Sequence, residues 1–279
     1  MPRVIAFQGE LGAYSHQACR SARPGWVYLP CGTFEDAVQV VNDRLVDQVL
    51  LPVENSIYGR VADIHQLLPD SGLYIIEEVF ERINIQAMAI PGTKIEDIKV
   101  AYSHPVLLGQ CKNFLKSKNI SAISYTDTAG SARLVAEDKN PSQMALASKL
   151  AGHIYGLETL EANIEDELHN RTRFVIMDRQ FNSERRSDQM MTSFFFAVRN
   201  IPAALYKALG GFATTGVNMV KLESYMVGGS FSATQFFAEI EGFPEDKAVE
   251  LALDELKFFS SYFKIIGVYP AHKSRFLHD

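Results

Sequence analysis

Residues 178–190 form a polar stretch between two strongly apolar segments, and this break constrains how the chain can fold. The stretch has the periodicity of neither a helix nor a strand, which is typical of a linker. A chain of 279 residues is long enough for two domains. We therefore expect an N-terminal region over residues 1–178, a linker over 179–190 and a separate C-terminal unit over 191–279.

The C-terminal unit shows a compact alternation of strand and helix patterns. Strand patterns cover 192–198, 217–226, 231–240 and 262–269, helix patterns cover 202–214 and 245–259, and a hairpin turn is expected at Val227-Gly228-Gly229-Ser230. The first helix pattern places Leu205, Leu209 and Phe212 on one face. The order βαββαβ predicts a sheet of four antiparallel strands backed by two helices.

The N-terminal region alternates strands and helices, which favours a largely parallel sheet with helices on its faces. The clearest strand patterns are residues 4–7, 48–53, 99–102, 122–125 and 174–177. Residues 73–90 form a long β-rich stretch that could pass between two lobes. One doubly wound domain is the alternative; we expect two lobes that face a cleft, roughly 1–76 with 160–178 and 77–159.

The overall charge and the cysteines limit the classes of function. The formal net charge is −6 and no basic tract occurs, which argues against a nucleic-acid partner. No apolar run approaches the roughly 20 residues that a membrane span requires. The chain enters a strand pattern without a signal peptide, and Cys19, Cys31 and Cys111 form no CxxC pair. We therefore expect reduced thiols and a cytoplasmic protein.

Polar side chains follow several predicted strands at their carboxyl ends, where open α/β sheets bind ligands. These groups are Gln8-Gly9-Glu10-Leu11-Gly12-Ala13-Tyr14-Ser15, Glu54-Asn55-Ser56 with Gly59, Ser103-His104-Pro105 with Gln110, and Thr126-Asp127-Thr128. A further group, His169-Asn170-Arg171-Thr172-Arg173-Phe174, lies at the entrance of a predicted buried strand. Amide, hydroxyl and guanidinium donors massed at strand ends indicate a surface that binds a small polyanion.

Each group also has a purely structural interpretation. Ser15, Ser103 and Asp127 precede helical patterns and are residue types that cap helices. His104 is more often a surface histidine than a catalytic base, and Glu54 is as easily a structural carboxylate as an acid catalyst. Capping and ligand binding are compatible, because both use the same helix end.

The chain contains no HExxH, no Cys/His cluster, no Asp-rich loop and no GxSxG, so the sequence predicts neither a metal site nor a cofactor. Gly9 and Gly12 belong to neither a dinucleotide fingerprint nor a P-loop. What remains is hydroxyls, amides, two arginines and backbone donors. Such a site suits a substrate that reacts with little assistance from the enzyme. The site would hold a carboxylated molecule and assist one leaving group.

The sequence resembles the prephenate dehydratases of the monofunctional bacterial type, which carry a C-terminal ACT regulatory domain. The resemblance covers essentially the whole chain and rests on five motifs in the family's order: Gly9 to Ser15, Pro52-Val53-Glu54-Asn55-Ser56 with Gly59, Ser103-His104-Pro105 with Gln110-Cys111, Asp127-Thr128-Ala129, and Asn170 with Thr172-Arg173-Phe174. It implies a two-lobed α/β catalytic region like the type II periplasmic-binding-protein fold, with the active site in its cleft, and then an α+β, ferredoxin-like ACT domain. It implies no cofactor.

The resemblance also implies the reaction, in which prephenate loses carbon dioxide and its ring hydroxyl to give phenylpyruvate, on the way to phenylalanine. It assigns Thr172 as the donor to the departing hydroxyl. We assign Arg173, whose planar fork suits a carboxylate, to the pyruvyl side chain of the substrate, and Phe174 to an apolar wall. The other expected catalytic residues are Asn55, Ser103 and Gln110, and the other substrate-binding candidates are Ser15, Glu54, Ser56, Asp127, Thr128 and Asn170.

In the resembling family, phenylalanine binds between two ACT domains as a feedback inhibitor, which implies a homodimer or a homotetramer. The expected effector-binding residues are Ala203, Ala204, Leu205, Asn218, Met219, Glu223 and Ser224. Alanine replaces the usual glycine in Pro202-Ala203-Ala204-Leu205, and Tyr225-Met226 replaces the usual Arg-Pro. Core packing is the alternative for Leu205 and Met219.

Two other functions stay open. Arogenate dehydratase acts on the transaminated analogue of prephenate, and the sequence does not locate the contact that distinguishes keto from amino. A binding-protein-like cleft joined to an ACT domain also suits a non-catalytic amino-acid sensor, although a sensor would have no use for Thr172-Arg173-Phe174.

Overall fold

A computed structural model describes residues 2–167, 169–226 and 233–276 of the chain. The predicted hairpin turn at 227–230 and the first residues of the strand predicted from Phe231 lie outside the described residues. Two compact units are present: unit 1 contains residues 1–65 and 79–174, and unit 2 contains residues 66–78 and 175–279. Each unit is described by itself below.

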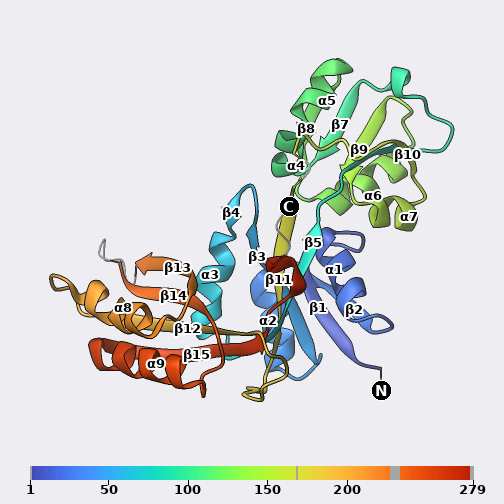
Figure 1. The fold of residues 1–279 in the computed structure, drawn as a ribbon. Coiled ribbons are helices and arrows are strands. Elements are labelled where there is room, and N and C mark those ends of the chain that lie inside the picture. The colour runs from blue at the N-terminus through green and yellow to red at the C-terminus, as the bar shows by residue number, and fades with distance from the viewer. Residues whose placement is uncertain (1, 168, 227–232, 277–279) are drawn as a thin grey trace. The chain divides into compact units, whose positions relative to one another are not determined.

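Unit 1 contains a first sheet whose strands are mostly parallel (Figure 1). Its strands are β1 (Val4–Gln8), β2 (Val27–Cys31), β3 (Gln48–Asn55) and the first half of β11 (Arg171–Asp178), in the order β11-β3-β1-β2, and β4 (Gly59–Arg60) pairs with β3. Strand β1 is parallel to both β2 and β3. The helices of this part are α1 (Tyr14–Ala22), α2 (Phe34–Asn42) and α3 (Ala62–Leu67). Ile5, Phe7 and Leu50 are fully buried, so the parallel strands form the core of this part.

Unit 1 also contains a second sheet with the order β10-β6-β9-β7-β8. Its strands are β6 (Gln86–Ala89), β7 (Val100–Ser103), β8 (Ser121–Ser124), β9 (Gln143–Ala147) and β10 (Glu158–Ala162). Its helices are α4 (Pro105–Gln110), α5 (Lys112–Ser117), α6 (Thr128–Asp138), α7 (Lys149–Tyr155) and the 3-10 turn η2 (Ile95–Asp97). Strands β7, β8 and β9 are parallel, whereas β6 is antiparallel to β9 and β10. The predicted two-lobed α/β architecture is therefore confirmed.

The chain passes between the two sheets twice, once from β5 (Tyr74–Arg82) to β6 and once from β10 to β11. The two passing segments are hydrogen bonded to each other: Ile83 N donates to the Asn170 carbonyl at 2.9 Å, and Ile164 N donates to the Ile85 carbonyl at 3.1 Å. Between these bonds, the buried Glu165 carboxylate accepts from Ile85 N at 2.9 Å. Paired crossing segments of this kind restrict how the two sheets can move against each other.

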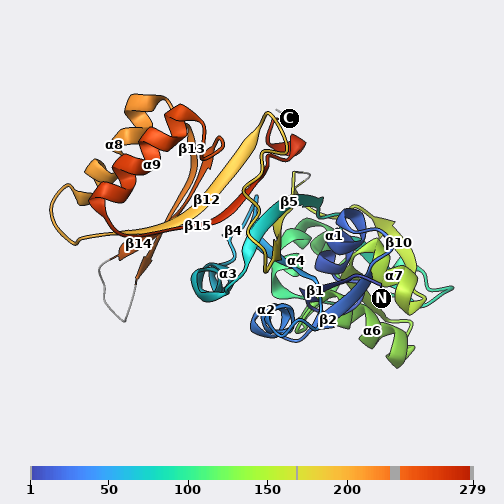
Figure 2. The same ribbon diagram turned by 90° about the horizontal axis from the view of Figure 1, so that it is seen from below.

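Unit 2 has the predicted βαββαβ order, which is confirmed (Figure 2). Its elements are β12 (Met190–Val198), α8 (Ala204–Thr215), β13 (Met219–Met226), β14 (Ala233–Glu241), α9 (Lys247–Phe259) and β15 (Ser260–Pro270). The strands pair antiparallel in the order β13-β14-β12-β15. Helices α8 and α9 cover one face of this sheet, where Phe194, Phe212 and Leu253 belong to one buried cluster. Alternate apolar residues on the strands and helical spacing on α9 produce this core.

The sheet of unit 2 also includes a segment from the N-terminal half of the chain. Residues 66–78 comprise the end of α3, the 3-10 turn η1 (Leu68–Asp70) and the start of β5. Strand β5 pairs in parallel with β15 at Ile75 and Gly267. A Cβ atom at position 267 would lie only 2.6 Å from the Ile75 Cβ, so glycine is required for this approach. The predicted domain boundaries at 178 and 190 stay a prediction.

Segment 66–78 is also held in unit 2 by charge. Glu78 is 1 % exposed, and its two carboxylate oxygens accept from the Arg275 guanidinium at 2.7 and 2.8 Å. The backbone N–H of His272 donates to the same carboxylate at 2.8 Å. Because a buried carboxylate needs a cation and hydrogen bonds to offset its lost hydration, these contacts anchor β5 to the residues that follow β15.

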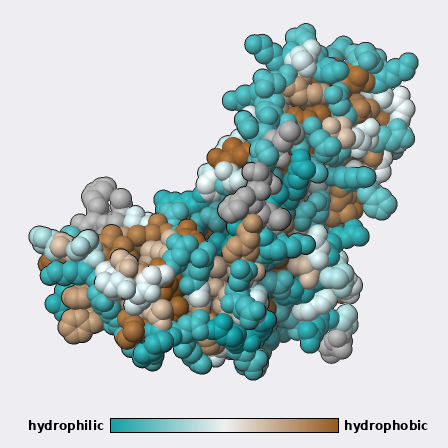
Figure 3. Space-filling model, viewed as in Figure 1, coloured by the Kyte–Doolittle hydropathy of each residue, from teal (hydrophilic) through white to brown (hydrophobic). Residues whose placement is uncertain are grey.

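Apolar side chains remain at the surface of unit 2. Tyr206 and Phe258 are each more than four-fifths exposed, and Val220 and Leu222 are exposed on β13, the outermost strand of the described sheet. The space-filling view shows hydrophobic residues gathered among hydrophilic ones on this unit (Figure 3). No helix in the described ranges combines the length and the apolar character needed to cross a bilayer.

Candidate active site

The end of β3 and the start of β11 lie side by side and bring two predicted catalytic residues together. Ser56 N donates to the Arg171 carbonyl at 2.9 Å, and Arg171 N donates to Ser56 Oγ at 2.9 Å. This pairing places the Asn55 carboxamide beside Thr172, with 3.0 Å between Asn55 Nδ2 and Thr172 Oγ1. Ser56 also donates from Oγ to the His169 carbonyl at 2.9 Å, so it ties the two strand ends together.

A chain of carboxamides extends from Thr172 into the second lobe. Asn55 Nδ2 donates to Asn170 Oδ1 at 2.7 Å, and Asn170 Nδ2 donates to Gln110 Oε1 at 2.9 Å. Asn170 and Gln110 are 1 % and 6 % exposed, so these amides are satisfied by each other rather than by solvent. The network joins β3, the segment before β11 and the end of α4.

The orientation of the Asn55 carboxamide is fixed by its neighbours. Its Oδ1 accepts from the backbone N–H groups of Ile57 and Tyr58, at 3.0 and 3.1 Å. Since a backbone N–H can only donate, Oδ1 is the oxygen and Nδ2 is the group that faces Thr172. Thr172 Oγ1 therefore accepts from Asn55, and its own hydrogen can be donated to a further acceptor. This geometry suits a hydroxyl that acts as a hydrogen-bond donor.

Arg173 and Glu54 form a separate pair. Arg173 is 2 % exposed, and its Nη1 lies 3.0 Å from Glu54 Oε1. Neighbouring residues of a strand point to opposite faces, so this pair lies on the face opposite to that of Thr172 and Asn55. The buried guanidinium thus has a structural partner, and the role of Arg173 in binding a substrate carboxylate stays a prediction.

Three of the other predicted residues lie at helix starts or strand ends. Asp127 caps α6, as its residue type predicted, with Oδ1 accepting from Gly130 N at 2.7 Å. Two capping predictions are wrong: α1 is preceded by Ala13 without a side-chain cap, and His104 rather than Ser103 caps α4. A serine suits a cap chemically, but the helix start depends on backbone geometry that the sequence pattern locates only to within a few residues.

The remaining predicted residues have the following surroundings. Ser103 is fully buried at the end of β7, and its Oγ donates to the Leu146 carbonyl at 2.6 Å. Phe174 is 2 % exposed and belongs to the interior. Ser15 and Thr128 are half-buried, in the first turns of α1 and α6. The substrate-binding roles of these residues stay predictions.

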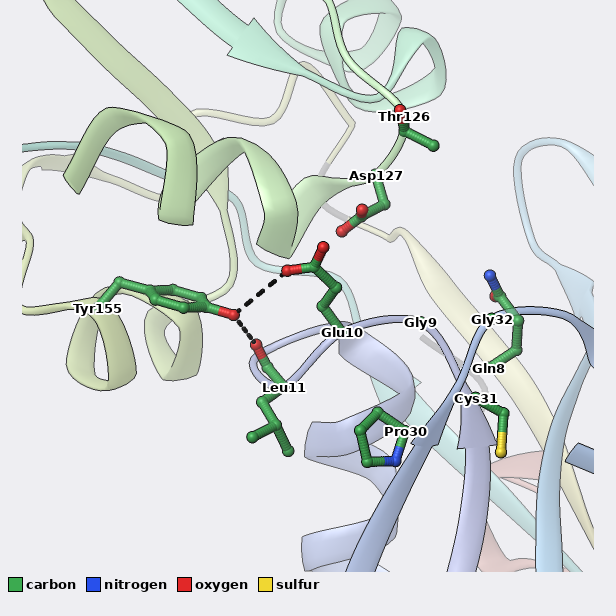
Figure 4. Close-up of a pocket in the computed structure, with 10 residues that line it drawn as sticks. All are labelled: Gln8, Gly9, Glu10, Leu11, Pro30, Cys31, Gly32, Thr126, Asp127 and Tyr155. Carbon is green, nitrogen blue, oxygen red and sulfur yellow. Dashed lines mark hydrogen bonds between the residues drawn. The ribbon is translucent and has the colours of Figure 1, made fainter. Parts of the chain in front are cut away.

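A cavity of about 490 Å³ opens at the carboxyl ends of β1 and β2 (Figure 4). It is lined by Gln8, Gly9, Glu10, Leu11, Pro30, Cys31, Gly32, Thr126, Asp127 and Tyr155. Of the predicted site residues Asp127 lines it, and Figure 4 shows the Asp127 and Glu10 carboxylates facing the same space. Thr172 is not among the lining residues, so the cavity and the carboxamide network are distinct features of unit 1.

The polar contacts around this cavity were not predicted from the sequence. Arg133 on α6 donates from Nε and Nη2 to both oxygens of Glu10, at 3.0 and 2.9 Å, which lowers the pKa of the Glu10 carboxyl. Tyr155 Oη donates to the Leu11 carbonyl at 3.0 Å. Burial raises the pKa of the Cys31 thiol, which keeps it protonated at neutral pH. These pairs are more than 120 residues apart, and no local pattern marks them.

The loop that contains Gly9 and Gly12, before α1, makes contacts with both lobes. Gly12 has a φ of 96°, and a Cβ atom there would lie 2.8 Å from the Ala151 Cα, so only glycine fits. Ser148 Oγ donates to the Gly12 carbonyl at 2.5 Å, and Gly12 N donates to His16 Nδ1 at 3.0 Å. His16 is buried and stacks on Phe7, with 5.4 Å between ring centroids.

Comparison with known proteins decides the family. The sequence model of one family, described as prephenate dehydratase, matches residues 5–182. The chain belongs to the prephenate dehydratase family. This family consists of carbon–oxygen lyases, so the chain is an enzyme of the dehydratase class rather than a sensor without catalysis.

Several relatives of the family are similar along nearly the whole chain. The bifunctional N-acyl-homoserine lactone acylase/prephenate dehydratase of Komagataeibacter europaeus is 47 % identical over 98 % of both chains. The arogenate dehydratase/prephenate dehydratase 1 of Arabidopsis thaliana, a chloroplastic protein, is 38 % identical over 95 % of this chain and 71 % of its own length. The crystal structure of the prephenate dehydratase of Arthrobacter aurescens in complex with L-Phe superimposes with a TM-score of 0.88 at 27 % identity, covering 96 % of this chain and 90 % of that one.

We predict a pH-dependent loss of stability that originates at His16. Burial, with a smaller contribution from Arg20, lowers the pKa of the folded imidazole below its ordinary 6.5. The unfolded chain therefore binds a proton before the folded one does, so the stabilisation is complete above about pH 6.5 and is lost as the pH falls toward the folded pKa. His16→Gln, which keeps an acceptor for Gly12 N, should flatten this dependence.

The measurement is the urea midpoint of both proteins between pH 7.5 and 5. His272, whose pKa is also lowered by burial, is present in both proteins, so the difference between the curves isolates His16. Parallel curves for the two proteins would contradict the assignment to His16.

Proposed function

We propose that this enzyme converts prephenate into phenylpyruvate, with Thr172 donating a hydrogen bond to the departing ring hydroxyl. The C–C bond to the ring carboxylate breaks and releases carbon dioxide, its electron pair enters the ring, and the C–O bond breaks to release hydroxide. The ring becomes aromatic. The observation that carries the proposal is the 3.0 Å bond from Asn55 Nδ2 to Thr172 Oγ1.

Hydroxide is a poor leaving group, so a donor aimed at its oxygen lowers the barrier more than contacts that bind the ground state equally well. Asn55 occupies one lone pair of Thr172 Oγ1 and leaves the hydroxyl hydrogen to point at the substrate. A hydroxyl that accepts one bond is polarised and donates a stronger one. Thr172 thereby stabilises the developing negative charge without full proton transfer.

Asn170 and Gln110 act in this proposal as positioning residues. Asn170 accepts from Asn55 Nδ2 at 2.7 Å, and Gln110 holds Asn170 in turn by accepting from Asn170 Nδ2 at 2.9 Å. Because the donor is already oriented, it need not be ordered during the reaction. Such positioning accounts for a large part of the rate enhancement that enzymes achieve. Arg173 is given no substrate contact in this proposal, because its guanidinium is buried, is paired with Glu54 and lies on the face opposite to that of Thr172.

Arogenate is the closest alternative substrate. It carries an amino group where prephenate carries the keto oxygen, and the names of the Arabidopsis relative include both activities. We propose prephenate as the preferred substrate because the relative with the higher identity is named a prephenate dehydratase. Cytoplasmic location stays part of the same proposal.

We further propose that phenylalanine binds between two copies of unit 2. Strands β12 and β13 are both antiparallel to β14, so they run in the same direction. Ala203, Ala204 and Leu205 follow β12, near the end where β13 carries Glu223 and Ser224. Asn218 and Met219 precede or begin β13 and therefore lie at the opposite end of the sheet.

One copy of unit 2 cannot bring all seven predicted effector residues to one ligand. Two copies related by a two-fold axis, with their α8 helices antiparallel, would place the start of β13 of one chain beside the start of α8 of the other. The exposed Val220 and Leu222 on the outermost strand support such pairing. A homodimer is therefore the smallest assembly that completes the proposed effector site. Its two-fold symmetry creates two such sites, and a homotetramer built from two of these dimers would contain four.

The alanine at position 203 bears on how this site works. Ala203 has a φ of 61° at the start of α8, in the left-handed region that glycine adopts at lower cost. An alanine there costs about 1 kcal/mol and adds a methyl group beside the proposed ligand. We propose that this methyl group narrows the effector site relative to that of family members with glycine.

N-acyl-homoserine lactone acylase is a second candidate activity. It is favoured by the name of the relative that is 47 % identical over 98 % of both chains. The reaction would break an amide bond with water and release a fatty acid and homoserine lactone.

The first prediction of the proposed function concerns Thr172. Thr172→Ala should lower kcat for prephenate about a hundredfold or more, the cost of removing one donor from a developing oxyanion, whereas Thr172→Ser should retain most of the rate. Phenylpyruvate formation is followed by absorbance, and melting temperatures establish that the variants are folded. Thr159→Ala, at an exposed position on β10, is the matched control. A folded Thr172→Ala enzyme with normal turnover removes Thr172 from the mechanism.

The second prediction concerns phenylalanine. Adding it should slow prephenate turnover and shift the chain toward dimers or tetramers in sedimentation. Ser224→Leu, which places bulk beside the start of α8, should weaken both effects while leaving basal turnover intact. Inhibition of a chain that stays monomeric at all concentrations contradicts the shared site.

The third prediction separates the candidate activities. The same preparation is given prephenate, arogenate and an N-acyl-homoserine lactone, and the products are resolved by chromatography. We expect prephenate to be turned over with the highest kcat/KM. Release of homoserine lactone by wild type and by Thr172→Ala alike would establish a second activity that does not use Thr172.

A further inference from the structure

Tyr58 makes a second connection between the two sheets that the carboxamide network joins. It lies in the turn between β3 and β4, and about half of the residue is exposed. Its Oη donates to the Val106 carbonyl at 3.2 Å, in the first turn of α4. The contact joins residues 48 positions apart, one after a strand of the first sheet and one after a strand of the second.

Both ends of this contact lead to predicted catalytic residues. On one side, Asn55 Oδ1 accepts from Tyr58 N at 3.1 Å, so the amide that binds Thr172 also sets the backbone that carries Tyr58. On the other side, α4 ends at Gln110, which accepts from Asn170. The contacts thus form a closed ring from Asn55 through Asn170, Gln110 and α4 to Tyr58 and back to Asn55.

Gly109 makes room for the phenol. A Cβ atom at position 109 would lie 3.2 Å from Tyr58 Oη, which is tighter than an ordinary contact. The Tyr58 side chain therefore lies against the turn of α4 that precedes Gln110. Because the phenol is half exposed, its bond to Val106 competes with water and contributes little to the stability of the fold.

We propose that Tyr58 is a positioning residue: it straps the turn after β3 to α4 and favours the arrangement in which Asn55 and Gln110 together orient Thr172. The strap opens when the Tyr58 hydroxyl leaves the Val106 carbonyl and donates to water instead, which lets substrate enter and product leave. Substrate binds the strapped arrangement, so its apparent affinity falls with the fraction of enzyme that is strapped. This inference rests on the proposed function of Thr172.

The kinetic test is Tyr58→Phe, which keeps the ring and removes the bridging hydroxyl. KM for prephenate should rise about fivefold, the size expected for one exposed hydrogen bond, while kcat changes by less than about twofold. The melting temperature should stay unchanged. Tyr206→Phe, at a far more exposed tyrosine of unit 2, is the control and should leave KM unchanged.

A double-mutant cycle tests the geometry. Gly109→Ala should raise KM in the wild-type background, where its methyl group crowds Tyr58 Oη, and should have a smaller effect in Tyr58→Phe, where that oxygen is absent. Additive effects contradict the contact. Equal KM for Tyr58→Phe and wild type, or a lower kcat with a lower melting temperature and unchanged KM, overturns the proposal.

Hydrogen exchange tests the contact between Tyr58 and Val106 without measuring turnover. Without substrate, the amides of Ile57 and Tyr58 should exchange faster in Tyr58→Phe than in wild type, because the strap no longer holds the turn. Equal exchange overturns the strap. If wild type fails to convert prephenate but exchange differs as expected, the proposed function is wrong and the strap remains.

Discussion

The pairing between the end of β3 and the start of β11 is the constraint on which the candidate site depends. Its register creates two matched pairs on opposite faces of the sheet, Asn55 with Thr172 and Glu54 with Arg173. A slip of one residue would move every side chain to the other face and would set Asn55 against Arg173. The bonds that Ser56 makes to His169 and Arg171 oppose such a slip. Backbone register, more than any single side chain, gives Thr172 its partner.

The network around Thr172 is built from neutral amides and not from charges. Asn55 and Asn170 each act as donor and acceptor, and Gln110 accepts from Asn170. A cation in the same place would bind the departing ring carboxylate in the ground state, which does not accelerate its loss. The buried charge of Arg173 is instead compensated by Glu54 on the opposite face. The buried ion pair and the hydroxyl that assists the leaving group therefore lie on opposite faces of the sheet.

The sequence predicted those features that depend on local pattern. The βαββαβ order of unit 2 follows from periodicity at Phe194, Phe212 and Leu253, and Asp127 caps α6 as its residue type suggests. Thr172, Asn55 and Gln110 were predicted from motifs of the family, and the structure brings them into one network. Their catalytic roles remain predictions.

The missed features are contacts between distant segments. No spacing or composition marks these contacts before the chain is folded, because they join residue types that are common on protein surfaces. They are Arg133 with Glu10, Tyr58 with the Val106 carbonyl, and Arg275 with Glu78. The capping of α4 by His104 was missed for another reason, because Ser103 is the better cap by type but is buried at the end of β7. Packing decided against local preference there.

The regulation proposed for unit 2 would act on the site through covalent connections. Strand β5 begins in unit 2 and ends in unit 1, and β11, which starts with Arg171 and Thr172, ends in unit 2. The start of β5 is held within unit 2 by Ile75 against Gly267 and by Glu78 against Arg275. A ligand can shift the site only by the difference in its affinity for two arrangements of unit 2. Two strands, rather than a single flexible linker, enter unit 2. Under the proposed phenylalanine binding, such a difference would reach Thr172 through β11, and it would reach the turn at Tyr58 through the segment that leads to β5.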